Sequence, residues 1–442
     1  MVAPTSSSTA LLTDRYELTM VQAALAQGTA SRRCVFEVFT RRLPAGRRYG
    51  VLAGTGRFLE ALRSFRFAET ELEYLREHDV VDATTLDFLA DYRFSGNIYG
   101  YAEGEVFFPG SPVLVVESTF AEGVLLETLA LSMLNFDSAV ASAASRMTSA
   151  AGSRPCVEMG SRRAHEQAAV AAARATAVAG FTGTSNLEAG RRYHLPTIGT
   201  AAHSFTLLHD DEPAAFAAQV AAYGPNTTLL VDTYDIAEGV RRAIAAAGTD
   251  LDAVRLDSGD LGPVAREVRD QLDSLGAAGT KIMVSSDLDE YAIASLAVAP
   301  VDSYGVGTSV VTGSGAPTCG MVYKLVSREG SSGEMEPVEK ASSAKMSVGG
   351  RKNAARLLDA SGRAAQELVV AGAGADWRPQ GEDLRALQVP LVLDGVVERD
   401  YIGAEGVRSA AQRHTTSRAE LSPSARRLSA GDPAVETVHE SI

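Results

Sequence analysis

The sequence predicts an α/β protein with a barrel-like catalytic part, because strand-like and alanine-rich helical segments alternate between residues 156 and 306. Such alternation is typical of parallel strands joined by helices. Seven strands suit a barrel better than an open dinucleotide-binding sheet, since no Gly-x-Gly-x-x-Gly follows the first strand. We expect strands at residues 156–159, 180–182, 197–200, 228–232, 253–257, 282–286 and 303–306, and helices at 164–179, 212–222, 236–247, 263–275 and 290–299.

The first 135 residues predict an α+β domain. Apolar residues recur at helical spacing over residues 11–27, and a short strand is expected at 36–39. A basic turn, residues 41–50, leads into the rest of the domain. There we expect helices at 69–76 and 83–89, and strands at 97–102, 106–108 and 113–117.

The chain beyond residue 320 predicts β-rich segments that pack on the N-terminal domain and complete it. Strands are expected at residues 321–326, 354–358 and 391–393, and the closing stretch 413–442 is polar and marked by proline. The expected domains are therefore residues 1–135, 136–320 and 321–442.

Composition excludes several classes of partner. The chain has 55 acidic and 41 basic residues, a formal charge of -14, and no block of lysine and arginine, so neither nucleic acid nor an anionic membrane is expected as a partner. The chain has three cysteines, Cys34, Cys156 and Cys319, which lack the spacing of a metal site. We interpret them as reduced thiols. No apolar run approaches the ~18 residues of a membrane span. We expect a cytoplasmic protein that binds anionic substrates through local arginines and backbone amides.

The strand that ends at Asp257 carries the most informative polar cluster. Arg255 lies two residues before Asp257, so both side chains point to one face, which is the interior mouth in a barrel strand. A guanidinium there binds a carboxylate, and Asp257 meets a ribose hydroxyl, a developing cation or a metal ion. The alternative is a buried structural ion pair. Asp260 is expected to cap the following helix.

Two more strand ends carry residues suited to phosphate chemistry. His203 follows the strand expected at 197–200, and a neutral imidazole is a good nucleophile towards phosphorus, although a lone histidine is more often structural. Gly307 and Thr308 offer open backbone amides and a hydroxyl, the alternative being an ordinary glycine-rich turn. Further charged groups at the same rim are Arg162, Arg163 and Asp287. The residues around Tyr16, by contrast, predict a helix with a packed apolar face and do not mark the tyrosine as functional.

These motifs together resemble the nicotinate phosphoribosyltransferase family. The resemblance runs from Leu11 to about Lys352 and rests on five segments, which are residues 12–20 (LTDRYELTM), 183–186 (GTSN), 199–205 (GTAAHSF), 255–260 (RLDSGD) and 305–309 (GVGTS). It implies an irregular, incomplete α/β barrel with an N-terminal α+β domain, and a homodimer with active sites at the interface. It also implies that nicotinate and phosphoribosyl pyrophosphate give nicotinate mononucleotide and pyrophosphate, coupled to ATP hydrolysis with Mg²⁺.

The resemblance also implies roles for single residues. His203 is similar to a histidine that ATP phosphorylates, and Asp257 to an acid near the ribose and the ring. The expected nicotinate contacts are Tyr16, which stacks on the ring, Ser185, Thr200 and Arg255. The expected contacts to phosphoribosyl pyrophosphate are Arg162, Asp287, Gly307 and Thr308.

Ser185 bears on the choice of substrate. Related nicotinamide enzymes are expected to carry aspartate at the matching place, where it would repel the carboxylate of nicotinate, whereas serine donates a hydrogen bond. One departure from the family pattern is Gly349–Gly350, where a Pro-Gly step is expected. It leaves open the contacts of the basic loop that spans residues 340–352.

Three other readings stay open from the sequence. One is a phosphoribosyltransferase that acts on nicotinamide or quinolinate, against which Ser185 and the His203 motif argue. Another is a catalytically silent relative that binds nucleotide and acts as an interaction partner. The third is a dehydrogenase on an α/β sheet, against which the missing dinucleotide fingerprint argues. The sequence leaves the ligands of the metal unknown.

Overall fold

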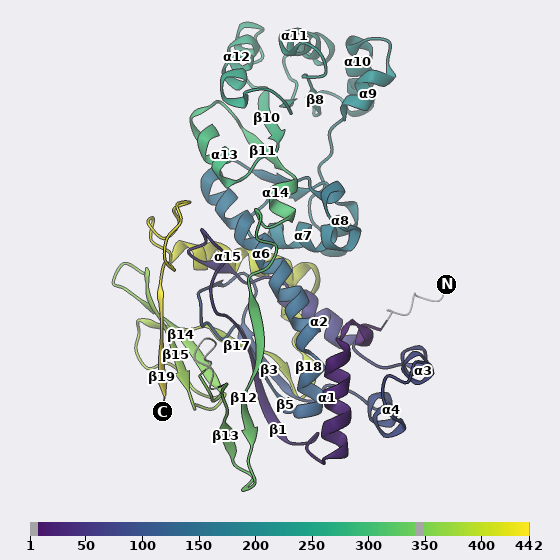
Figure 1. Cartoon of the computed structure of the whole chain (residues 1–442). Coiled ribbons are helices and arrows are strands. Elements are labelled where there is room, and N and C mark those ends of the chain that lie inside the picture. The colour runs from purple at the N-terminus through teal and green to yellow at the C-terminus, as the bar shows by residue number, and fades with distance from the viewer. Residues whose placement is uncertain (1–7, 341–347, 442) are drawn as a thin grey trace. The chain divides into compact units, whose positions relative to one another are not determined.

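The computed structural model describes residues 8–340 and 348–441 (Figure 1). It divides into two compact units, which we treat separately. The first unit contains Met1–Ser142 and Ala316–Ile442, and the second contains Ala143–Gly315. The middle of the basic loop, residues 341–347, lies outside the described residues.

A seven-stranded sheet organises the first unit, in the order β13-β12-β1-β5-β3-β17-β18. Strand β1 lies between β12 and β5 and pairs antiparallel with both, so that Phe36 lies opposite Leu325 on one side and Val116 on the other. Phe36 and Val116 belong to a large apolar core, whereas Val35, Val115 and Val326 form a small cluster of their own. Side chains on both faces of β1 are therefore buried, which explains why its sequence is mostly apolar instead of alternating between apolar and polar residues.

The N-terminal elements of this unit follow the sequence expectation closely. The helix expected at 11–27 is α1, and the strand expected at 36–39 is the centre of β1. The bounds are η1 (Ala10–Leu12), α1 (Arg15–Ala26), β1 (Arg33–Thr40), β2 (Gly50–Val51), α2 (Thr55–Arg63), α3 (Glu69–Glu77), α4 (Ala83–Ala90), β3 (Asn97–Tyr101), β4 (Val106–Phe107), β5 (Leu114–Thr119), α5 (Phe120–Val124) and α6 (Glu127–Ala151).

The C-terminal segments contribute strands to two sheets of the same unit. Strand β17 pairs with β3, which places a C-terminal strand beside an N-terminal one, and β14, β15, β16 and β19 form a four-stranded sheet. The bounds are β12 (Met321–Glu329), β13 (Met335–Pro337), β14 (Lys352–Leu358), β15 (Ala364–Ala371), β16 (Leu384–Ala386), β17 (Gln388–Leu393), β18 (Val396–Val397), η4 (Arg399–Tyr401), α15 (Gly403–Ala419) and β19 (Glu436–Ser441).

Helix α15 is a 17-residue element that the sequence did not reveal. Apart from Val407, its buried residues are small or polar, among them Ala410, His414 and Ser417, so it shows no strong apolar stripe. A buried ionic cluster lies beside it, because Arg356 pairs with Glu105, Glu367 and Glu420 at 2.9, 2.9 and 3.0 Å. The cluster joins the C-terminal sheet to the turn before β4.

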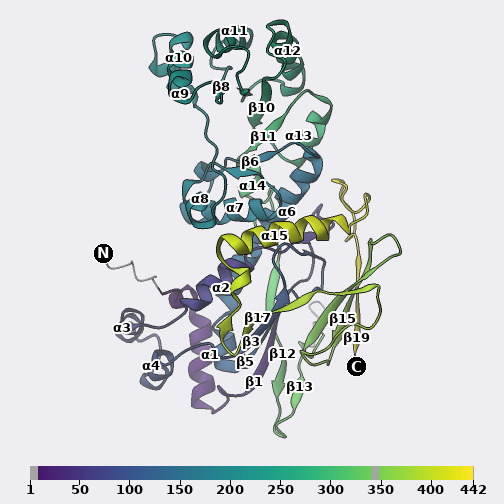
Figure 2. The same cartoon turned by 180° about the vertical axis from the view of Figure 1, so that it is seen from behind.

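The second unit is built on a six-stranded parallel sheet that forms a half-barrel, in the order β7-β6-β11-β10-β9-β8. Figure 2 labels β6, β8, β10 and β11 of this sheet. Helices connect the strands in the expected alternation. The bounds are β6 (Cys156–Glu158), η2 (Ser161–Arg163), α7 (Glu166–Val178), β7 (Gly183–Thr184), α8 (Leu187–Tyr193), α9 (His203–Leu208), α10 (Glu212–Tyr223), β8 (Thr228–Leu230), α11 (Ile236–Ala247), β9 (Ala253–Leu256), α12 (Leu261–Ser274), β10 (Lys281–Ser286), α13 (Glu290–Ser295), η3 (Leu296–Val298), β11 (Ser303–Val306) and α14 (Thr308–Val311).

The predicted fold class is confirmed, but one predicted strand is absent from the sheet. Residues 197–200 make only an isolated bridge, between Thr184 and Thr197. Pro196 comes directly before this segment, and the side chains of residues 196–199 are exposed, so little packing holds it as a strand. The strand expected at 180–182 is displaced to Gly183–Thr184. The half-barrel therefore ends at β7.

One helical stretch passes a simple test for a membrane span. Phe120–Ala151 has 32 residues and a mean hydropathy of 1.4 in its most apolar window, although polar and charged residues interrupt the apolar ones. Of that window, 61% is buried within the protein. Burial of this extent is what a core helix of a folded domain shows.

Candidate active site

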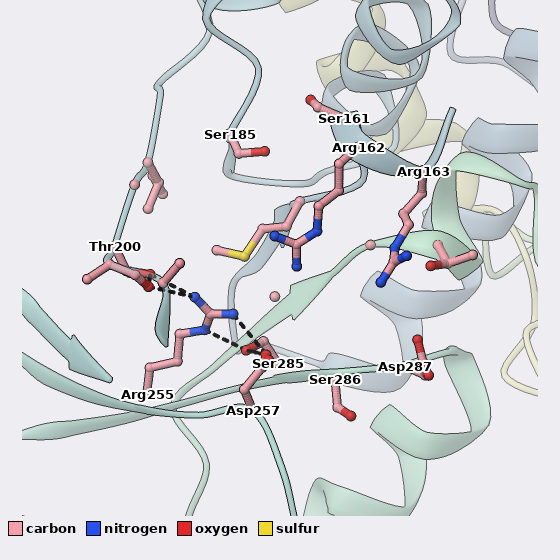
Figure 3. A pocket seen from close by; sticks show the side chains of 18 residues that line it. Ser161, Arg162, Arg163, Ser185, Thr200, Arg255, Asp257, Ser285, Ser286 and Asp287 are labelled. Carbon is pink, nitrogen blue, oxygen red and sulfur yellow. Dashed lines mark hydrogen bonds and ion pairs between the residues drawn. The ribbon is translucent and has the colours of Figure 1, made fainter. Parts of the chain in front are cut away.

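A cavity of about 450 Å³ opens at the carboxyl ends of the strands of the second unit (Figure 3). In parallel sheets these ends meet at one edge, which is where α/β enzymes bind their ligands. All residues that line the cavity belong to the second unit. The polar ones include Ser161, Arg162, Arg163, Ser185, Thr200, Arg255, Asp257, Ser285, Ser286, Asp287 and Thr308.

Arg255 is the most connected side chain in the cavity. Its Nε donates to Ser285 Oγ at 2.6 Å, its Nη1 to Thr200 Oγ1 at 2.8 Å, and its Nη2 to Asp257 Oδ1 at 2.8 Å. Ser285 Oγ also donates to Asp257 Oδ1 at 2.5 Å. The guanidinium is therefore fixed from three sides and faces the cavity in one orientation (Figure 3).

Asp257 is held as a carboxylate. Burial alone would raise its pKa, but hydrogen bonds from Ser285 and Arg255 and the charges of Arg255 and His203 outweigh this effect, so the pKa lies below its ordinary value. Its backbone is fixed as well, because Asp232 Oδ2 accepts from Asp257 N at 2.8 Å and from Ser258 Oγ at 2.6 Å. An anionic, rigidly placed carboxylate is suited to face a developing positive charge.

His203 is the first residue of α9 and lies beside the cavity. Its Nδ1 lies 3.1 Å from Thr233 Oγ1, which fixes the orientation of the ring. The ring is partly buried and close enough for its charge to lower the pKa of Asp257. The strand expected at 197–200 is an irregular segment, but His203 still lies at the predicted edge of the sheet.

Arginines and an open turn face Arg255 across the cavity. Figure 3 shows Arg162 and Arg163 reaching from η2 towards the side where Arg255 and Ser285 lie. Gly307 precedes α14 and Thr308 begins it, and both line the cavity. Asp287 follows β10 at the rim, with an exposed side chain. The arrangement offers cationic and backbone groups to a phosphorylated ligand.

Close packing beneath the turn favours glycine at position 305. A Cβ atom there would lie 2.8 Å from Met159 Sδ and 3.1 Å from Ser285 Cβ. Because Gly305 pairs with Ser285 on one side and Val157 on the other, it lets three strands approach below the cavity.

Two of the predicted nicotinate contacts differ in how the structure places them. Ser185 directly follows β7, has an exposed side chain, and lines the cavity together with Thr200. Tyr16 lies on α1 of the first unit, with 45% of its surface exposed. Its stacking role therefore stays a prediction.

The sequence did not single out Ser285 or Asp232, which hold Arg255 and Asp257 in place. The role of Ser285 follows from the parallel register, in which Met283 lies opposite Arg255 and brings Ser285 next to the guanidinium. Asp260 precedes α12 as predicted but makes no side-chain capping bond.

Comparison with known proteins agrees with the site. The sequence model of the nicotinate phosphoribosyltransferase (NAPRTase) N-terminal domain matches residues 11–135, and that of the nicotinate phosphoribosyltransferase (NAPRTase) family matches residues 155–364. A nicotinate phosphoribosyltransferase of Mycobacterium tuberculosis is 55% identical over 441 residues, which cover 97% of this chain and 94% of that protein. One from Bacillus subtilis is 36% identical over 80% of this chain and 74% of that protein.

Solved structures show the same fold. The crystal structure of human nicotinic acid phosphoribosyltransferase matches with a TM-score of 0.81 and 26% identity, and 97% of each chain is covered. The nicotinate-nucleotide pyrophosphorylase of Pyrococcus furiosus matches with a TM-score of 0.75 and 24% identity, over 92% of this chain and 96% of that one, which shows a shared fold. With more than half of its residues identical to one relative over nearly its full length, the chain belongs to the nicotinate phosphoribosyltransferase family.

Proposed function

We propose that the protein makes nicotinate mononucleotide and pyrophosphate from nicotinate and phosphoribosyl pyrophosphate, and hydrolyses ATP to ADP and phosphate as it does so. The reaction belongs to NAD salvage, in accord with the family of its relatives. The observation that carries the proposal is the charge of the cavity. Three arginines and two aspartates line it, although the whole chain has a formal charge of -14. A locally cationic cavity in an acidic protein is suited to anionic substrates.

Nicotinate is bound by the Arg255 side of the cavity in this proposal. The guanidinium is fixed by Ser285, Thr200 and Asp257, and a planar fork of donors fits a carboxylate. Ser185 adds a hydroxyl donor near the ring, and the family resemblance assigns to Tyr16 the face that stacks on the ring. Quinolinate carries a second carboxylate and nicotinamide carries none, so both fit this set of donors less well.

The phosphoribosyl donor occupies the opposite side. Arg162, Gly307 and Thr308 bind its phosphates through a guanidinium and backbone amides, and Asp287 lies at the rim. Departure of pyrophosphate leaves an oxocarbenium-like ribose, which the fixed carboxylate of Asp257 stabilises. The ring nitrogen of nicotinate then forms the new bond to the ribose carbon, so the chain acts by positioning and by electrostatics.

The carboxylates of the cavity suit Mg²⁺ that is bound jointly by the protein and by substrate phosphates. The described residues contain no group of three or more histidine, cysteine, aspartate or glutamate side chains that could enclose a metal ion. Mg²⁺ usually binds one or two carboxylates together with substrate phosphates, and Asp287 and Asp257 present carboxylates to the cavity. When bound, Mg²⁺ would neutralise charge on the pyrophosphate leaving group.

ATP coupling is assigned to His203. Its imidazole is oriented by Thr233 and lies at the start of a helix beside the cavity, so its free nitrogen can accept a phosphoryl group from ATP. We further propose a cytoplasmic homodimer, which rests on the family resemblance.

The test is product formation from nicotinate and phosphoribosyl pyrophosphate with Mg²⁺, with and without ATP, and with nicotinamide and quinolinate in parallel. We expect nicotinate mononucleotide, a rate or yield raised by ATP, and little product from the other two bases. Binding of phosphoribosyl pyrophosphate without turnover of any base would overturn the proposal and favour a catalytically silent relative.

A further inference from the structure

Glu158 is a fully buried carboxyl at the end of β6, below the cavity but outside its lining. One oxygen, Oε1, accepts from the backbone N–H of Gly160, and the other, Oε2, accepts from Thr184 Oγ1 at 2.5 Å. No ion pair to Glu158 is present among the residues that the structure describes. A buried carboxyl without a cation is costly, so its presence calls for a specific role.

The two donors to Glu158 come from two different loops of the cavity. Gly160 leads into η2, which carries Arg162, and Thr184 ends β7, directly before Ser185. Ser185 itself is held by the same residue, because its backbone N–H donates to the carbonyl oxygen of Glu158 at 2.8 Å. Glu158 therefore contacts two loops. One carries Ser185, which we propose selects nicotinate, and the other carries Arg162, a proposed phosphate contact.

Further hydrogen bonds close this arrangement into a ring. Thr184 Oγ1 accepts from the backbone N–H of Asn186 at 2.9 Å, and Asn186 Nδ2 donates to Ser161 Oγ at 3.0 Å. Ser161 adjoins Gly160, which returns the path to Glu158. The two loops are thus joined twice, through Glu158 and through the contact of Asn186 with Ser161.

Neighbouring segments of the cavity are attached to the same ring. The backbone N–H of Thr184 donates to the carbonyl of Pro196 at 3.0 Å, and that of Ile198 donates to the carbonyl of Thr184 at 2.9 Å, which fixes the segment that leads to Thr200. At Gly160 a Cβ atom would lie 2.3 Å from Val311 Cγ1 and 3.0 Å from the carbonyl oxygen of Gly307. The ring therefore packs against the turn at Gly307.

The chemistry of the ring favours a carboxyl group. An acceptor with two oxygens can receive two converging donors, whereas an amide offers one oxygen and one N–H group. Burial raises the pKa of Glu158, and the hydrogen bonds from Thr184 and Gly160 oppose that effect.

We propose that Glu158 is a positioning residue that sets, through this ring, the Ser185 loop and the Arg162 loop together, so that binding of the pyridine acid and of the phosphoribosyl donor depends on one buried group. The inference rests on the proposed function. It extends that function by naming the group that couples the two substrate subsites.

Thr184→Val tests the proposal, because valine keeps the shape of threonine but removes the hydroxyl that Glu158 and Asn186 share. We expect KM for nicotinate and KM for phosphoribosyl pyrophosphate each to rise about tenfold, the usual scale for a buried acceptor left unsatisfied, with kcat within about twofold. Thr184→Ser keeps the hydroxyl and is expected to behave as the unmodified enzyme. Glu158→Gln turns one acceptor into a donor and is expected to raise both KM values as well.

Binding of nicotinate mononucleotide, measured by calorimetry on the same variants, gives a readout that does not need turnover. If the unmodified enzyme binds the mononucleotide but makes none, the proposed function fails and the ring is still tested by the affinities. The inference is overturned if Thr184→Val changes neither KM nor this affinity, if only one of the two KM values moves, or if Thr184→Val and Thr184→Ser lose activity equally.

Discussion

Arg255 and Asp257 form an ion pair, with Nη2 2.8 Å from Oδ1, at the carboxyl end of β9. Asp257 follows Arg255 by two positions, so both side chains lie on the same face of the strand, and Ser285 of the neighbouring strand contacts both. The pair is partly open to the cavity, since 30% of the Asp257 side chain is exposed. It therefore differs from a purely structural buried pair, because each member still presents a group to a ligand.

Arg255→Lys is expected to raise KM for nicotinate by tenfold or more, the scale for a lost charge-assisted contact of about 1.4 kcal/mol or greater. A single ammonium cannot contact Ser285, Thr200 and Asp257 together, so the orientation is lost although the charge remains. Initial-rate kinetics measure the effect. Arg266→Lys, an exposed position on α12, is the control and should leave KM unchanged.

His203→Ala is expected to abolish the stimulation by ATP while some synthesis of nicotinate mononucleotide persists. The imidazole is the phosphoryl acceptor that we propose, and alanine offers no nucleophile in its place. Product yield with and without ATP is the measurement, and His78→Ala on the exposed end of α3 is the control. A His203→Ala enzyme whose yield stayed fully stimulated by ATP would remove His203 from the mechanism.

Ser185→Asp is expected to weaken nicotinate binding about tenfold or more, because a second carboxylate would face that of the substrate in a partly desolvated cavity. Nicotinamide, which carries no charge, should be less affected, so the preference between the two bases shifts. Competition between nicotinate and nicotinamide measures this shift. Ser185→Ala separates loss of the hydroxyl from like-charge repulsion, and equal effects of the two variants would contradict the repulsion.

The stability of the protein is expected to fall as pH rises from about 4.5 to about 7, through the carboxyl of Glu17. Burial raises its pKa to about 7, and the carboxylates of Glu127 and Asp14 act in the same direction against hydrogen bonds from Thr128. In this window the folded protein keeps a proton that the unfolded chain has lost, so the folded state is favoured less as pH rises, with no further change above the window.

Glu17→Gln should flatten that dependence, since glutamine does not titrate. The melting temperature between pH 4.5 and 8 is the measurement, and the decline of the unmodified protein should exceed that of the variant. Parallel curves for the two proteins would exclude Glu17 as the titrating group.

Gly305→Ala is expected to destabilise the second unit by about 1–3 kcal/mol, the usual cost of overpacking, and to lower activity by displacing Ser285. Gly279→Ala is a matched control, because a Cβ at Gly279 meets nothing within 4 Å. Denaturant unfolding monitors stability. A Gly305→Ala protein as stable and active as Gly279→Ala would show that the strands can separate freely there.

The sequence alone determined the alternation of strands and helices in the second unit and the strand ends that carry Arg255, Asp257 and Asp287. It did so because apolar runs that end in polar clusters are local patterns, set by the spacing of side chains along one strand. Helix α11, Ile236–Ala247, occupies the residues that its periodicity predicts, since its core-facing Val240 and Ala243 recur at helical spacing. The family motifs were equally local and identified the reaction.

Only the tertiary structure decided which groups touch. Ser285 reaches Arg255, and Asp232 reaches the backbone of Asp257, through strand register that no local pattern encodes. Residues 197–200 do not form the predicted strand, because a strand needs a neighbouring strand to pair with and side chains that pack, and β-propensity alone does not supply these. Helix α15 was not predicted because its buried residues form no strong apolar stripe. The ring around Glu158 was not predicted because its members lie in different loops.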